Sequence, residues 1–299
     1  MPLAIIAFHF DAYLRLDGLA VRWETLALAL VILLAIVTSG LIAGRARADG
    51  SERRLRRDDL LFIILGIVPG AVIGGRITYV LIHLDYYHAN PGLIFDPSSG
   101  SLALTGAVVL GTLTGCHVAR LLEAPVARWL DVAAVGLIIG LALGKLANVL
   151  GANGQGVLSS LSWASAYFGP GPWGVLGPEL PAHPAQVYEA LGDALVIAVV
   201  LVLGWFGPFR AGRGRRFLLV LAGWAIVRFM VAFTWRDAPV LGSLRVEQLL
   251  DIGLLIVALG ALVATRRSPA TIDGATSSSS LPAAPAGTSV WPGSREDAS

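Results

Sequence analysis

Charged residues are scarce in this chain of 299 residues: Asp, Glu, Lys and Arg make up 14 %, whereas hydrophobic residues make up 56 %. A soluble globular domain has about 25 % charged residues, so this composition excludes one. The mean hydropathy of +0.73 points the same way. The formal net charge is only +2, and we expect no nucleic-acid partner. The sequence therefore predicts a polytopic membrane protein.

Cysteine and lysine are scarcer still. Cys116 is the only cysteine, which excludes an intrachain disulfide, and nothing in the cysteine content indicates a metal site or a redox pair. We expect no metal and no cofactor. Lys145 is the only lysine, and the other 21 basic residues are arginines. A lysine in an apolar span is costly, by about 2.5–3.5 kcal/mol on insertion scales, so we expect it to serve a function.

Seven apolar segments are long enough to cross a bilayer as helices, which need about 20 residues each. The predicted class is thus all-α, with spans at Trp23–Ala43, Leu60–Leu84, Leu102–Leu122, Trp129–Leu150, Gln186–Phe206, Phe217–Trp235 and Gln248–Thr265. Residues 1–22 lack a basic region ahead of an apolar core, so we expect an amphipathic arm rather than a cleaved signal peptide. Residues 268–299, rich in Ser, Ala, Pro and Gly, are predicted to be a disordered tail.

Arginine counts in the loops predict the orientation. The first, third and fifth loops and the C-terminal edge carry fourteen arginines, against four on the opposite side. Because basic residues stay on the cytoplasmic side, we expect the N-terminus outside and the C-terminus in the cytoplasm. The long loop of residues 151–184 then lies outside. It is interpreted as a lid or docking surface, with a flexible insertion as the alternative.

Charged residues within the spans are predicted to gather in the outer half of the bundle. These residues are Arg76, Lys145, Glu189, Asp193 and Arg228. An ion-pair network between helices would explain Arg76 and Glu189, whereas Lys145 and Arg228 together require an anion. A phosphate ester is the anion that these side chains usually bind. Asn148, three residues after Lys145, shares its helix face and is either a ligand or an interhelical hydrogen-bonding residue.

Several motifs follow one another in a recognisable order. They are Gly74-Gly75-Arg76 with Tyr79-Val80; Asp131, Gly140, Gly144-Lys145 and Asn148; Asn153-Gly154-Gln155; His183-Pro184-Ala185-Gln186-Val187-Tyr188-Glu189; and Arg228-Phe229. From Arg22 to Thr265 the chain resembles the bacterial prolipoprotein diacylglyceryl transferases, and the HPxQxYE segment is the most specific part.

The resemblance implies an enzyme of the bacterial plasma membrane that works at the outer leaflet without a metal. Its partners would be phosphatidylglycerol and the lipobox cysteine of a prelipoprotein signal peptide, with glycerol phosphate released. We expect Arg228 and Lys145 to hold the phosphate and His183, or a water, to take the thiol proton; for His183 the alternative is a capping or packing role. The expected substrate-binding residues are Arg76, Asn148, Gln186, Tyr188, Glu189, Thr105 and Asn153.

Five positions depart from the family's motifs. Lys145 replaces an arginine, Thr105 replaces the histidine often assigned as the base, and the remaining three departures are Glu24, Gln155 and Ala232. These departures leave a second hypothesis open, a catalytically silent relative that binds an anionic lipid or a lipoprotein precursor. A transporter or a heptahelical receptor is the third, but the seventh span has no lysine for a retinal Schiff base and no matching pair of broken helices stands out.

Overall fold

The computed structural model describes residues 5–45, 56–96, 102–175, 177–204 and 213–267. Within them, seven helices are long and apolar enough to cross a membrane. They are α1 (Trp23–Arg45), α2 (Arg57–Ile82), α4 (Leu104–Leu121), α5 (Val126–Val149), α6 (Ala185–Gly204), α7 (Arg215–Val231) and α8 (Val246–Arg267). Each predicted span agrees with a candidate span to within three residues at either end, so the seven-helix class is confirmed. The predicted tail lies outside the described residues.

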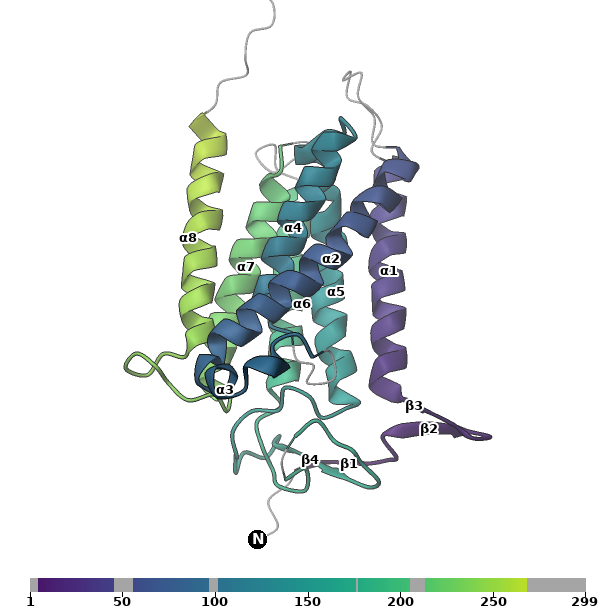
Figure 1. The fold of residues 1–299 in the computed structure, drawn as a ribbon, viewed down its shortest axis with the longest axis vertical. Coiled ribbons are helices and arrows are strands. Elements are labelled where there is room, and N and C mark those ends of the chain that lie inside the picture. Colours follow the sequence, from purple (N-terminus) through teal and green to yellow (C-terminus); the bar gives the residue numbers. More distant parts are fainter. Residues whose placement is uncertain (1–4, 46–55, 97–101, 176, 205–212, 268–299) are drawn as a thin grey trace, which may run out of the picture.

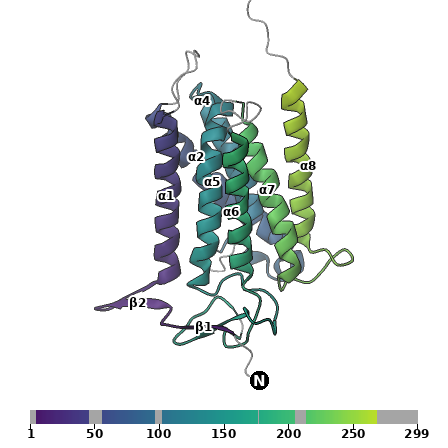
Figure 2. The same cartoon turned by 180° about the vertical axis from the view of Figure 1, so that it is seen from behind.

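The helices run alternately up and down, and short strands gather at one end of the bundle (Figures 1 and 2). We call this the sheet end; α1, α4, α6 and α8 begin there, and α2, α5 and α7 end there. The short helices α3 (Leu84–Ala89), η1 (Pro91–Leu93) and η4 (Ala232–Thr234) follow helices that finish at this end. Whether this end faces outward, as the arginine counts predict, stays a prediction.

Strands in the N-terminal arm add a feature that the all-α prediction lacked. β1 (Ile6–His9) pairs in parallel with β4 (Ser165–Phe168), in the register Ile6 opposite Ser165. β2 (Tyr13–Leu16) and β3 (Leu19–Arg22) form an antiparallel hairpin that leads into α1. The arm is therefore extended, and its first strand is hydrogen-bonded to the long loop of residues 151–184.

A seam of small residues joins α2 to α4, which lies against it in Figure 1. A Cβ added at Gly70 would overlap the Thr114 side chain, and one at Gly74 would overlap the carbonyl oxygen of Gly106. Glycines at this spacing let two helix backbones approach closely, as is common in membrane helix pairs. The seam fixes α2 in place, and with it the residues at the sheet end of that helix.

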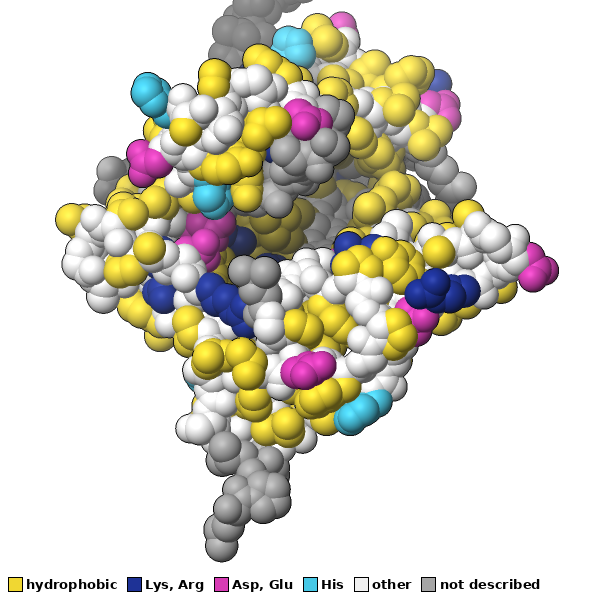
Figure 3. Space-filling view, turned by 60° about the horizontal axis from the view of Figure 1, so that its bottom comes forward, with side chains coloured by type: hydrophobic (Ala, Val, Ile, Leu, Met, Phe, Trp, Pro, Cys, Tyr) yellow, Lys and Arg dark blue, Asp and Glu magenta, His cyan; other side chains and the backbone are white. Residues whose placement is uncertain are grey.

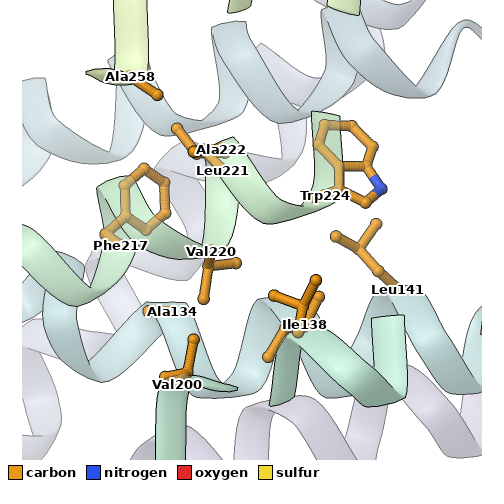
Figure 4. Packing of buried hydrophobic residues seen from close by; sticks show 11 residues of the cluster. Ala134, Ile138, Leu141, Val200, Phe217, Val220, Leu221, Ala222, Trp224 and Ala258 are labelled. Carbon is orange, nitrogen blue, oxygen red and sulfur yellow. The ribbon is translucent and has the colours of Figure 1, made fainter. Parts of the chain in front are cut away.

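The apolar core lies among α5, α6 and α7, with Ala258 from α8 (Figure 4). Phe217, Val220 and Trp224 on α7 pack with Ile138 of α5 and Val200 of α6. Trp224 is fully buried. On the outside of the bundle, large apolar side chains such as Leu65 and Leu191 are about two-thirds exposed, which suits contact with lipid.

Asp131 holds the start of α7 at the end opposite the sheets. Its carboxylate is buried and accepts hydrogen bonds from the backbone N–H groups of Arg213, Gly214 and Arg216, at 2.9–3.1 Å. The first N–H groups of a helix have no partner inside the helix, and the helix dipole favours a negative charge there. Asp131 of α5 therefore sets the position of α7, which carries Arg228 at its other end.

We predict that Asp131→Asn destabilises the protein by about 1–3 kcal/mol, because an amide NH₂ would then face backbone N–H donors. The measurement is the apparent Tm in detergent, with Asp58→Asn, an exposed position in α2, as control. Equal Tm values for the two variants would contradict the proposed role of Asp131.

Candidate active site

A polar cavity of about 600 Å³ opens at the sheet end. In the space-filling view of that end, basic and acidic side chains gather around a hollow whose wall is partly apolar (Figure 3). Residues from α1, α2, α4, α5, α6, α7, α8, the long loop and the segment after η4 line it. The polar residues among them are Tyr79, His83, Lys145, Asn148, Gln155, Glu189, Arg228, Arg236, Asp237 and Glu247.

Lys145 on α5 forms an ion pair with Glu189 on α6. The Nζ atom lies 2.7 Å from Oε2, and both side chains are largely buried, with 15 % and 3 % exposed. Both residues fall within helices long enough to span a membrane. In such surroundings a charge is kept only when a partner or a ligand compensates its desolvation. Glu189 is therefore the carboxylate partner of Lys145 inside the cavity.

Arg228 on α7 contacts two carboxylates of α8. Its Nε is 3.2 Å from Oδ1 of Asp251, and its Nη2 is 3.4 Å from Oε2 of Glu247. The guanidinium carbon also lies 5.1 Å and 5.0 Å from the ring centres of Trp224 and Trp235, within cation–π range. Nη1 takes part in neither ion pair. The sequence reading missed both acids, because they lie on a different helix from Arg228.

The cationic groups of Lys145 and Arg228 converge on the same side of the bundle. Both residues line the cavity, and the Lys145 Nζ lies 6.0 Å from the same Trp235 ring that Arg228 approaches. The expectation that these two cations lack an anion of their own is wrong: Glu189, Glu247 and Asp251 supply carboxylates. The ion-pair network therefore includes them, and a phosphate would have to join or rearrange it.

Arg236 brings a third cation to the cavity. Its Nε donates to the carbonyl oxygen of Gly156 at 2.7 Å, which ties the segment after η4 to the long loop. Partial burial lowers the pKa of this guanidinium, although arginine stays protonated at neutral pH. In the arginine count that predicts the orientation, Arg236 is one of the four arginines on the outer side. The sequence signal for a place in the cavity is that Arg236 directly follows a buried span.

The sequence leaves open an ion pair between Arg76 and Glu189. In the structure Arg76 does not pair with Glu189. Its guanidinium donates instead to the backbone carbonyls of Leu93, Ile94 and Asp96, at 2.6–3.2 Å. The Tyr87 ring lies 5.3 Å from the guanidinium carbon. Arg76 is not among the residues that line the cavity. The arginine thus holds the loop that follows α2 and α3.

His183 and Tyr188 form a separate cluster beside the cavity. The His183 Nδ1 is 3.3 Å from the Tyr188 hydroxyl oxygen, which also accepts a hydrogen bond from Trp163 Nε1 at 2.8 Å. The backbone N–H of His183 donates to the carbonyl of Val157. Neither His183 nor Tyr188 lines the cavity that holds Lys145 and Arg228. The structure does not bring His183 together with the two cations.

Of the other predicted site residues, only Asn148 lines the cavity. Gln186 is buried in the first turn of α6, next to Tyr167. Burial raises the pKa of the Tyr167 phenol, with Gln186 acting in the opposite direction. The Asn153 amide donates to the Glu24 carboxylate, which also pairs with Arg22 at 3.0 Å. Thr105 is buried in the first turn of α4, beside Leu104, which does line the cavity.

The arrangement can bind an anionic headgroup and stabilise negative charge that develops on it. Three cations from different segments line one partly apolar cavity, and an asparagine adds a hydrogen-bonding group. Such groups act strongly on a departing oxyanion because little water screens them. The carboxylates beside the cations hold them in place when no ligand is bound.

The chain matches one family of known proteins over most of its length. A family model described as prolipoprotein diacylglyceryl transferase matches residues 11–264. Among curated proteins, the chain is similar to the phosphatidylglycerol–prolipoprotein diacylglyceryl transferases of Finegoldia magna, Geobacter sulfurreducens and Lysinibacillus sphaericus. The identities are 25 %, 28 % and 29 %, over 80 %, 87 % and 87 % of this chain. The matches cover 89 %, 96 % and 92 % of those relatives.

We predict that Glu189→Gln destabilises the protein by about 3–5 kcal/mol, because Lys145 then stays buried without its carboxylate. The double variant Lys145→Met/Glu189→Gln should recover part of this loss. The measurement is a double-mutant cycle, with apparent Tm values for Lys145→Met, Glu189→Gln and the double variant. Asp11→Asn, which breaks the exposed pair with Arg15, is the control and should leave Tm unchanged. Additive effects at positions 145 and 189 would mean that the two groups are not coupled.

Proposed function

The chain belongs to the prolipoprotein diacylglyceryl transferase family, and from this premise we propose that it transfers the diacylglyceryl group of phosphatidylglycerol to the lipobox cysteine of prelipoproteins. One observation carries the proposal: Lys145 and Arg228, from separate helices, line one cavity and approach the same tryptophan ring. Glycerol phosphate is the second product.

In the proposed reaction the thiolate sulfur attacks the glyceryl carbon that bears the phosphate ester. A C–S bond forms, the C–O bond breaks, and its electron pair leaves with the phosphate oxygen. Lys145, Arg228 and Arg236 stabilise this leaving group. Arg228 meets the phosphate through Nη1, while Asp251 and Glu247 hold Nε and Nη2. Asn148 binds a hydroxyl of the glycerol headgroup.

We place the cavity at the outer leaflet of the bacterial plasma membrane. The helix ends that carry Arg57, Arg120, Arg128, Arg216 and Arg267 lie at the end of the bundle away from the cavity, and arginine-rich segments stay cytoplasmic. The long loop of residues 151–184 and the N-terminal strand then lie outside, where an exported prelipoprotein presents its lipobox. Arg76, through the loop it holds, shapes the approach to the cavity.

One departure from the family's motifs has a counterpart in the structure. Where the family has an acid four residues after the arginine, this chain has Ala232, and the acids that pair with Arg228 come from α8. Lys145 keeps the charge of the family's arginine but not its bidentate fork. The proposed chemistry therefore uses the same kinds of charged group, and the acids that pair with Arg228 come from another helix.

A second candidate function is a catalytically inactive relative that binds an anionic lipid or a lipoprotein precursor. It is favoured by the carboxylates beside Lys145 and Arg228, which compensate both cations without a substrate. Complementation separates the candidates: growth of a strain depleted of its own transferase requires turnover, and lipid binding without rescue would favour the inactive relative.

We predict that the purified chain in phosphatidylglycerol nanodiscs converts a lipobox peptide to a thioether-linked product. Lys145→Ala and Arg228→Ala should each lower kcat by about 10²–10³, because each removes a group that stabilises the leaving phosphate. Product is measured by mass spectrometry, and Arg15→Ala, at an exposed position in the arm, is the control. Rates like wild type in both cavity variants would exclude this assignment.

A further inference from the structure

His83 lines the cavity, a position that its sequence context did not indicate. It directly follows the last residue of α2 and is seven residues after Arg76 and four after Tyr79, on one face of the helix. Its ring packs against the Tyr79 ring with 4.2 Å between centroids, and Tyr79 lines the same cavity. Among the histidines that the structure describes, His83 alone is part of the lining.

A hydrogen bond sets the tautomer of His83. Its Nδ1 lies 2.9 Å from the carbonyl oxygen of Tyr79, and a carbonyl oxygen only accepts. Nδ1 therefore carries the proton, and in the neutral ring the lone pair is on Nε2. The described part of the chain provides no hydrogen bond to it.

The reaction needs a base, and the family's usual residue is missing. Thr105 stands where the family has a histidine, and a hydroxyl cannot take a thiol proton at neutral pH. Glu189 and Glu247 are engaged with Lys145 and Arg228. His183 faces Tyr188 outside the cavity.

We propose that His83 is the catalytic base, which rests on the proposed transferase function. Nε2 takes the proton from the cysteine thiol, whose ordinary pKa is about 8.5, and the thiolate attacks the glyceryl carbon. The C–O bond breaks towards the phosphate, and the proton on Nε2 then passes to water. The Tyr79 carbonyl keeps Nδ1 protonated throughout and accepts a stronger hydrogen bond from the imidazolium.

The test compares His83→Asn with wild type in phosphatidylglycerol nanodiscs. Asparagine retains a donor near the Tyr79 carbonyl but has no basic nitrogen. We expect kcat at pH 7 to fall by about 10²–10⁴, with lipid binding and apparent Tm unchanged. His83→Gln, the second variant, should lose as much. His117→Asn, at an exposed position on α4, is the matched control and should keep full activity.

A second arm at pH 9 separates a base from a structural role. Most cysteine thiol ionises by itself there, so the deficit of His83→Asn should shrink at least about tenfold relative to wild type. The charged groups that line the cavity with His83 are Lys145, Glu189, Arg228, Arg236, Asp237 and Glu247. These groups are present in wild type and in His83→Asn alike. The effect of their titration on the rate therefore cancels in the ratio of the two rates.

Either of two results would overturn the role of His83: near wild-type kcat in both variants, or a deficit that is equal at pH 7 and pH 9. In both cases the wild-type enzyme still makes product, so the proposed function stands. If the wild-type chain makes no thioether product, the proposed function fails and the role of His83 fails with it.

Discussion

The cost of placing charge in an apolar medium is the constraint on which this structure depends. Lys145 and Arg228 lie in helices of membrane-spanning length, and each is kept there by carboxylates of a neighbouring helix. Breaking such a pair leaves an uncompensated charge, which costs far more than the intact pair contributes. The pairs join α5 to α6 and α7 to α8, so the electrostatics of the cavity also tie four helices together at the sheet end.

The same pairs make the cavity responsive to an anion. A carboxylate that holds a cation in place competes with any phosphate that approaches, and the phosphate prevails only through additional contacts. Arg228 offers such a contact at Nη1, and Arg236 adds another cation from the segment after η4. For the proposed lipid substrate, the apolar wall beside the charges is the part of the cavity that suits the acyl side of the molecule.

Much of the fold could be predicted because a membrane helix is a local property of the sequence. Apolar runs of about 20 residues fix the spans, and the spans placed Lys145, Asn148, Glu189 and Arg228 at one end of the bundle. The partners of these residues were not predictable. Asp251 meets Arg228 only because α8 packs beside α7, and the pairing of β1 with β4 joins residues 159 positions apart, such as Ile6 and Ser165. Arg76 was misjudged for the same reason, since its acceptors are backbone carbonyls of a loop.

Chemistry at such a site depends on where groups meet rather than on which helix carries them. The acids that pair with Arg228 come from α8, although the family's motif places an acid on the helix of the arginine itself. The proposed base, His83 directly after α2, in place of a histidine on α4 is a change of the same kind, because α2 and α4 pack along a seam of small residues. Residues at the sheet ends of these two helices reach the same cavity: His83 from one and Leu104 from the other. When motifs are compared one helix at a time, such exchanges look like lost residues. The cavity nevertheless contains cations, acids and a histidine.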